Sequence, residues 1–132
     1  CANIYLNSLD LRIDARRVGL SHARRSVSFL VNKGNSTGMS RIAETAPAGT
    51  KAEMFEETII EVDTLDAQLA SIRGQVVFLK IDVEGLEHAV LRGFGPMLDE
   101  RRIRMIQFEY GQLNLQARFF LGDFYELLGR RG

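Results

Sequence analysis

The sequence predicts an α/β fold, in which helices cover an open, mainly parallel sheet within one domain over residues 1–132. Residues 75–82 and 103–109 are apolar runs that each end on an acid, and a helix-like pattern follows each run. The first run is apolar on both faces, which is typical of a central strand in a parallel sheet. A content of 45% hydrophobic and 26% charged residues fits one globular domain.

The first part of the chain predicts a helix end and two strands. Residues 1–6 predict the last turn or two of a helix, and residues 7–10 the turn after it. Residues 11–18 alternate apolar and charged side chains, which is the period of a half-buried strand. After a turn region at 19–25, the β-branched and apolar residues 26–31 predict a second strand.

The middle of the chain predicts a loop, a short strand and a helix. Residues 32–56 are polar and rich in turn-forming types, which predicts a long loop or an irregular hairpin. Residues 58–62 predict a third strand. A helix is predicted over residues 65–72 from apolar side chains at helical spacing, and Gly74 ends it.

The second half predicts two consecutive strand–helix units. Glycine is common just after a helix, and proline suits a first helical turn. The predicted elements are a strand at 75–82, a helix at 85–92 followed by Gly93, a short helical piece from Pro96, a strand at 103–109 and an amphipathic helix at 119–128.

Composition and charge exclude several classes of function. Lysine and arginine number 17 and are balanced by 17 acids, so no broad attraction to nucleic acid or an anionic membrane is expected. The apolar runs are far shorter than the roughly 20 residues that span a bilayer. One cysteine excludes an internal disulfide and a cysteine zinc site, so a reducing, cytoplasmic setting is expected.

Three carboxylates follow the predicted parallel strands. In open α/β sheets, ligands bind outside the carboxyl ends of the strands, so Asp82, Glu84 and Glu109 are expected to line one crevice. Gly85 allows a sharp turn from strand to helix. From these residues alone, Asp82 could equally be a helix cap and Glu84 a solvated charge or a partner of backbone amides.

The segment VVFLKIDVEGLEHAVLRGF, at residues 76–94, closely resembles the signature of the FkbM family of S-adenosylmethionine-dependent methyltransferases. That signature is a hydrophobic strand, then Lys-Ile-Asp-Val-Glu-Gly, and later Glu, Leu and Gly. The resemblance extends to VDTLDAQL at 62–69, GNSTGMS at 34–40 and IQFEYG at 106–111. It departs at GLSHARR, where the family usually carries an acid and this chain has His22.

The resemblance implies a Rossmann-like class I methyltransferase sheet and S-adenosylmethionine as cofactor. It implies methyl transfer to a hydroxyl of a small-molecule acceptor such as a sugar or a polyketide. Asp82 would contact the cofactor or the acceptor, Glu109 would orient the acceptor or take its proton, and Glu84 would assist them. The backbone of Gly19 and Leu20 would border the adenine. Some O-methyltransferases bind magnesium with such acids, but no third ligand is evident at a strand end, so no metal is expected.

One feature of the family pattern is absent. No Gly-x-Gly turn follows a strand in this sequence, although class I methyltransferases hold their cofactor there. The resemblance therefore implies that residues 1–132 are the C-terminal part of a methyltransferase domain, which lacks the first strands. A non-catalytic or truncated α/β module that serves in binding or assembly is the alternative. A dehydrogenase-like nucleotide domain is less favoured, because the dinucleotide fingerprint is missing.

Overall fold

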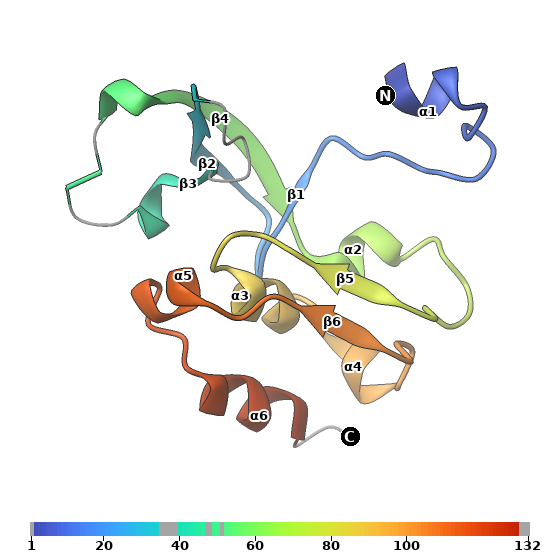
Figure 1. The fold of residues 1–132 in the computed structure, drawn as a ribbon. Helices are drawn as coiled ribbons and strands as arrows, with labels where there is room; N and C mark the ends of the chain where they lie inside the picture. The colour runs from blue at the N-terminus through green and yellow to red at the C-terminus, as the bar shows by residue number, and fades with distance from the viewer. Residues whose placement is uncertain (1, 35–39, 47–48, 51, 130–132) are drawn as a thin grey trace.

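The structure is a computed structural model that describes residues 2–34, 40–46, 49–50 and 52–129. Its elements are, in chain order, α1 (Ala2–Leu6), β1 (Gly19–Leu20), β2 (Arg25–Asn32), β3 (Arg41–Ile42), the 3₁₀ turns η2 (Ala43–Thr45) and η3 (Ala52–Met54), β4 (Phe55–Asp63), α2 (Leu65–Leu69), β5 (Leu79–Ile81), α3 (Glu87–Arg92), α4 (Pro96–Asp99), β6 (Ile106–Phe108), α5 (Gln112–Gln116) and α6 (Leu121–Gly129) (Figure 1). The chain is therefore mixed α/β, as predicted.

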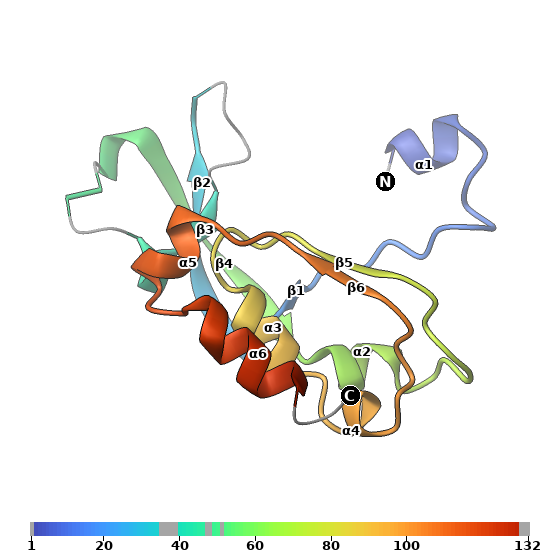
Figure 2. The same cartoon turned by 60° about the horizontal axis from the view of Figure 1, so that its bottom comes forward.

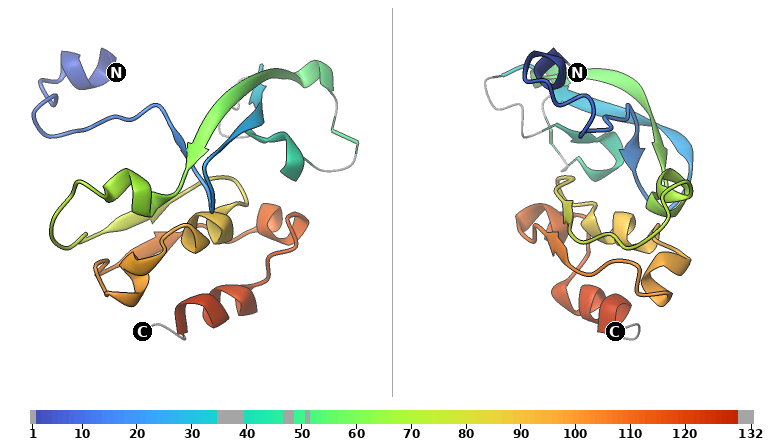
Figure 3. Two further views of the ribbon diagram at one scale, coloured as in Figure 1. Left: turned by 180° about the vertical axis from the view of Figure 1, so that it is seen from behind. Right: turned by 90° about the vertical axis from the view of Figure 1, so that its right-hand side faces the viewer.

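Within the described residues, the strands form two separate sheets. The larger one has the order β1-β4-β2-β3, and the smaller one contains β5 and β6. In the larger sheet β1 runs parallel to β4, whereas β2 runs antiparallel to both β4 and β3. The long β2–β4 ribbon extends away from the helices, and α1 lies apart from the rest of the chain (Figure 3).

The prediction of a mainly parallel sheet is wrong, because the larger sheet is mixed. The β2–β4 ladder runs from Arg25 opposite Val62 to Asn32 opposite Phe55. Parallel pairing of strands needs a crossover that returns the chain to its starting end, whereas β2 and β4 run in opposite directions. The one strand–helix–strand unit among the described residues that gives a parallel pair is β5–α3–α4–β6. The Rossmann-like sheet of class I methyltransferases itself stays a prediction for this chain.

The prediction that residues 75–82 form a central strand is also wrong. Within the described residues, β5 pairs with β6 alone, which makes it an edge strand. Before β5 the pairing is reduced to a single bridge between Val76 and Ile103. Val77 and Phe78 expose 65% and 50% of their surface. Their apolar character therefore does not mark the burial on both faces that the prediction assumes.

The strand predicted at 11–18 does not form. Turn hydrogen bonds from the amides of Arg12 and Ile13 to the Leu9 carbonyl begin this segment, and an irregular stretch follows up to β1. Leu11 is 97% exposed and Ile13 44%. Alternation produces a strand when a neighbouring strand and a core use its two faces, and the described residues supply neither here.

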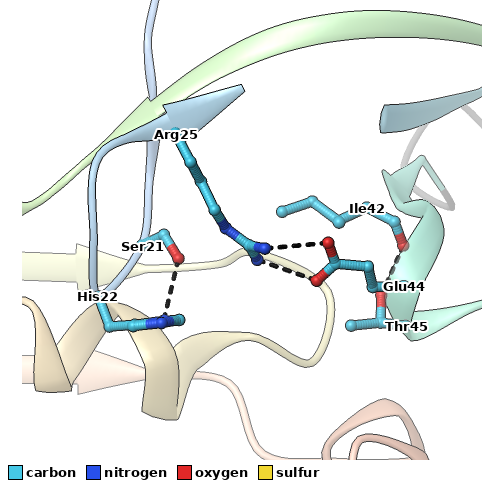
Figure 4. A network of polar contacts seen from close by, with 6 residues as sticks. All are labelled: Ser21, His22, Arg25, Ile42, Glu44 and Thr45. Atoms are coloured by element: carbon cyan, nitrogen blue, oxygen red, sulfur yellow. Dashed lines mark hydrogen bonds and ion pairs between the residues drawn. The ribbon is translucent and has the colours of Figure 1, made fainter. Parts of the chain in front are cut away.

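The segment predicted as a loop or irregular hairpin at 32–56 contains β3 and two 3₁₀ turns. Arg25 of β2 donates two hydrogen bonds to the Glu44 carboxylate, at 3.0 and 2.9 Å, and the Thr45 hydroxyl donates to the Ile42 carbonyl at 2.8 Å (Figure 4). These contacts fix η2 beside the start of β2. Most of the GNSTGMS segment, at 35–39, lies outside the described residues.

Two apolar clusters form the core. The larger one joins β5 to helices on one side of the β5–β6 pair, where Figure 2 shows α3 and α6. Its buried members are Leu65, Ile81, Val90, Leu91, Phe94 and Phe124. The smaller cluster lies in the larger sheet and consists of Val27, Ile42 and Val62, with Leu86 packed against it. Leu86 thus connects the segment after β5 to the larger sheet. No helix in the described part of the chain is long and apolar enough to cross a bilayer.

Candidate functional site

The register of the small sheet brings two of the predicted acids together. Ile81 lies opposite Phe108 in the parallel β5–β6 pair, so Asp82 and Glu109 follow side by side at the carboxyl ends of the two strands. The Glu109 amide also donates to the Ile81 carbonyl at 3.3 Å. The expectation that these two acids end neighbouring parallel strands is therefore confirmed.

The segment after Asp82 makes a tight turn that carries Glu84. Both Glu84 and Gly85 have positive φ angles, +55° and +98°. A side chain at position 85 would be strained by this angle, and its Cβ would lie 2.8 Å from the Leu113 carbonyl oxygen. Glycine is thus required where the turn passes close to α5. Glu84 occupies an unusual conformation for a non-glycine residue, a feature that often marks functional sites.

Glu87 stabilises this turn by accepting hydrogen bonds from its backbone amides. Its side chain is 1% exposed, and its Oε1 accepts hydrogen bonds from the amides of Val83 at 3.0 Å and Gly85 at 3.3 Å. Its Oε2 accepts a hydrogen bond from the side-chain amide of Asn114, which is itself 2% exposed. One reading of the sequence gives Glu84 the task of bonding the backbone amides of the turn, and Glu87 performs that role instead.

Asp82 forms an exposed ion pair with Lys80. The Lys80 ammonium donates to Asp82 Oδ2 at 2.8 Å, and the two side chains are 59% and 42% exposed. This hydrogen bond, with the lysine charge, lowers the pKa of Asp82, and the same contact raises the pKa of Lys80. Asp82 is therefore ionised and Lys80 protonated at neutral pH.

Glu84 experiences the opposite effect. Desolvation raises the pKa of Glu84, and the charges of Glu109 and Asp82 raise it further, whereas Arg41 acts against them. Arg41 is a buried residue of β3, and its neighbour Ile42 belongs to the cluster that Leu86 contacts. The structure thus places the three predicted acids within one electrostatic environment, with Lys80 and Arg41 nearby.

A small cleft of about 70 Å³ adjoins two of these acids, Glu84 and Glu109. Its lining residues come from the turns after β5 and β6, from the start of α3 and from α5, and they also include Glu87 and Asn114. In the part of the chain that the structure describes, no group of three or more histidine, cysteine, aspartate or glutamate side chains is arranged to hold a metal ion.

Gly19 and Leu20 lie elsewhere, in β1 beside the end of β4. A Cβ at position 19 would come within 2.9 Å of Val62 Cγ1, so close packing accounts for this glycine. Leu20 borders a separate cleft of about 270 Å³. The other lining residues are Asp14, Arg16, Val18, Leu65, Gln68, Leu69 and Ile72. None of the three predicted carboxylates lines that cleft.

His88 is packed against aromatic side chains. Its ring stacks on Phe119 with centroids 4.4 Å apart and meets Phe124 edge-on at 5.3 Å. Its Nδ1 atom is buried without a hydrogen-bond partner in the described residues. Burial lowers the pKa of His88, and Arg92 adds to this while Asp123 opposes it.

This burial predicts a loss of stability in acid. The unfolded chain binds a proton at His88 more readily than the folded chain does, so the free energy of unfolding falls as the pH drops below about 6.5. We expect His88→Gln to flatten this part of the stability profile, measured by thermal unfolding between pH 5 and 8. His22→Gln, at the other and exposed histidine, is the matched control. An unchanged slope in His88→Gln would contradict the prediction.

The sequence matches the family described as the methyltransferase FkbM domain over residues 2–132. The chain belongs to the FkbM methyltransferase family. No curated protein and no solved structure gives a significant match.

Membership in the FkbM family makes the chain a methyltransferase-family protein. The structure shows where the FkbM signature lies in the fold. The residues of KIDVEG form the end of β5 and the turn beyond it, directly beside the end of β6. Sequence reasoning missed Asn114 and Arg41, which lie far along the chain from the signature. Glu87, in contrast, could have been found, because it is the later glutamate of the FkbM signature.

Proposed function

We propose that the chain transfers a methyl group from S-adenosylmethionine to a hydroxyl oxygen of a small molecule, such as a sugar or a polyketide. The observation that carries this proposal is the gathering of Asp82, Glu84 and Glu109 at the carboxyl ends of two parallel strands. Ligands of α/β sheets bind at such ends. The FkbM match supports the reaction class.

The charge of this site suits the proposed cofactor. S-Adenosylmethionine carries a sulfonium and an ammonium group, and an ionised Asp82 provides the negative charge that a cation needs nearby. When bound, the cofactor supplies an activated methyl group to the acceptor oxygen. Asp82 holds the cationic end of the cofactor or the acceptor, and Glu109, side by side with it, orients the acceptor hydroxyl and takes its proton.

The adenine end suits the second cleft. Leu20, Leu65 and Leu69 provide apolar walls for a flat ring, and Gln68 offers hydrogen-bonding groups at the same cleft. Of the two residues predicted to border the ring, Leu20 lines this cleft, and Gly19 precedes it in β1. This residue chemistry supports adenine binding.

Methyl transfer can be tested directly with the full-length protein. It is incubated with S-adenosylmethionine carrying a labelled methyl group and with panels of sugar, polyketide and lipid-linked glycan acceptors. We expect label on an acceptor oxygen, and binding of both S-adenosylmethionine and its demethylated product in calorimetric titration. Absence of both label transfer and cofactor binding would instead favour a non-catalytic module that serves in binding or assembly.

A further inference from the structure

A continuous chain of hydrogen bonds, fully buried where Glu87 meets Asn114, joins the two turns that carry the acids. The amides of Val83 and Gly85, after β5, donate to Glu87 Oε1. Asn114 donates its side-chain amide to Glu87 Oε2, and Asn114 Oδ1 accepts from the Gly111 amide, after β6, at 2.7 Å. Glu87 and Asn114 are 27 residues apart in the chain.

Burial makes this connection costly to break. Glu87 and Asn114 are 1% and 2% exposed, so neither side chain can replace a lost partner with bulk water. A buried carboxylate is stable when N–H donors satisfy it, and Glu87 receives three. Removing one partner leaves an unsatisfied group that only movement of a turn can relieve.

We propose that Glu87 and Asn114 act as a pair of positioning residues that fix the spacing between the turn carrying Asp82 and Glu84 and the strand end carrying Glu109. The inference rests on the proposed methyl transfer for its consequence in activity. The pair acts through these acids, because it anchors the backbone on both sides of them. A change of about 1 Å in the placement of reacting groups can lower a rate by about 100-fold.

The complementarity of the pair allows an exchange test. In Glu87→Gln, the new side-chain amide faces the Asn114 amide, so two donors meet. In Asn114→Asp, two carboxylates meet. In the double variant Glu87→Gln/Asn114→Asp, the introduced glutamine can still accept from the turn amides while it donates to the introduced aspartate, which still accepts from the Gly111 amide. The double variant therefore restores every hydrogen bond. Only the bond between positions 87 and 114 reverses its direction.

The experiment measures methyl transfer and unfolding of all three variants in the full chain. We expect each single variant to lower kcat by about 100-fold with little change in KM, and the double variant to recover most of the loss. Val90→Ala is the matched control, because Val90 is a fully buried residue of α3 outside the hydrogen-bond chain. It should lower stability as the single variants do and keep kcat.

A second readout is independent of activity. Hydrogen exchange followed by NMR reports how well the Val83, Gly85 and Gly111 amides are held by this pair. We expect these three amides to exchange faster, relative to the rest of the chain, in each single variant and to return toward the wild-type rate in the double variant, whereas Val90→Ala should cause no such selective change. If the single variants keep the wild-type exchange and kcat, or if the double variant recovers neither, the positioning role is overturned. If exchange behaves as described and neither the wild type nor any variant transfers methyl, the positioning role stands and the proposed function fails.

Discussion

Replacing Asp82 with asparagine is expected to lower methyl transfer by about 100-fold or more, because it removes the negative charge at the end of β5 and keeps the side-chain shape. The pKa of Asp82 is lowered by Lys80, so the wild-type group is fully ionised at neutral pH. The substitution should leave the fold intact, since an exposed ion pair contributes little to stability. Initial rates with labelled S-adenosylmethionine give the comparison.

Lys80→Gln is the matched control for this prediction. It breaks the same ion pair and leaves the carboxylate of Asp82 in place, so its activity should stay close to that of the wild type. Glu109→Gln should lower activity less than Asp82→Asn does, because it removes a proton acceptor and leaves the cation-binding charge. If Asp82→Asn keeps wild-type turnover, the KIDVEG motif serves only as a strand-to-helix turn. If Lys80→Gln loses as much activity as Asp82→Asn, the loss comes from the broken ion pair and not from the missing charge of Asp82.

The elements that could be predicted from the sequence are those with strong local signals. The strand at 26–31, the helix starting at Leu65 and the short helix at Pro96 all form close to the predicted positions. Thr64 shows why, since its side chain accepts from the Ala67 amide at 3.2 Å and caps the helix start. Such interactions depend on neighbouring residues only, and the sequence displays them directly.

Strand pairing and strand position could not be predicted in the same way, because they depend on distant partners. Residues 11–18 carry the alternation of a strand and form none. Arg41–Ile42 pairs antiparallel with β2 within the segment predicted as a long loop or an irregular hairpin, and the sequence alone does not decide between those two. The apolar run that ends in β5 suggests a central strand and lies at an edge among the described residues. Composition identifies residues able to enter a sheet, and their neighbours decide whether they do.

The candidate site shows the same division. Asp82 and Glu109 could be placed together because both end apolar strands of one strand–helix–strand unit, and the register agrees. Asn114 could not be found, because α5 is short and its contact with Glu87 crosses 27 residues. The link between the two turns is therefore a property of the folded chain. Its only sign in the sequence is Glu87, an acid of the FkbM signature with no role that the sequence explains.

The second large effect is expected at Gly93, where α3 ends. A Cβ added there would lie 2.2 Å from the Ser21 carbonyl oxygen, which is buried backbone after β1 and cannot rotate away as a side chain could. The φ angle of Gly93 is −78°, so an alanine is compatible with the local conformation and the conflict is purely steric. We expect Gly93→Ala to lower the free energy of unfolding by about 3 kcal/mol, measured by denaturant titration.

Gly122→Ala tests whether this loss comes from the contact with Ser21 or from replacing a glycine as such. Gly122 lies in α6, and a Cβ there would meet no atom within 4 Å. Alanine is the better helix former, so this variant should gain up to about 1 kcal/mol in unfolding free energy. The two substitutions are chemically identical and should change stability in opposite directions. Equal stability of Gly93→Ala and the wild type would mean that β1 and the end of α3 are not packed as tightly as the 2.2 Å approach requires.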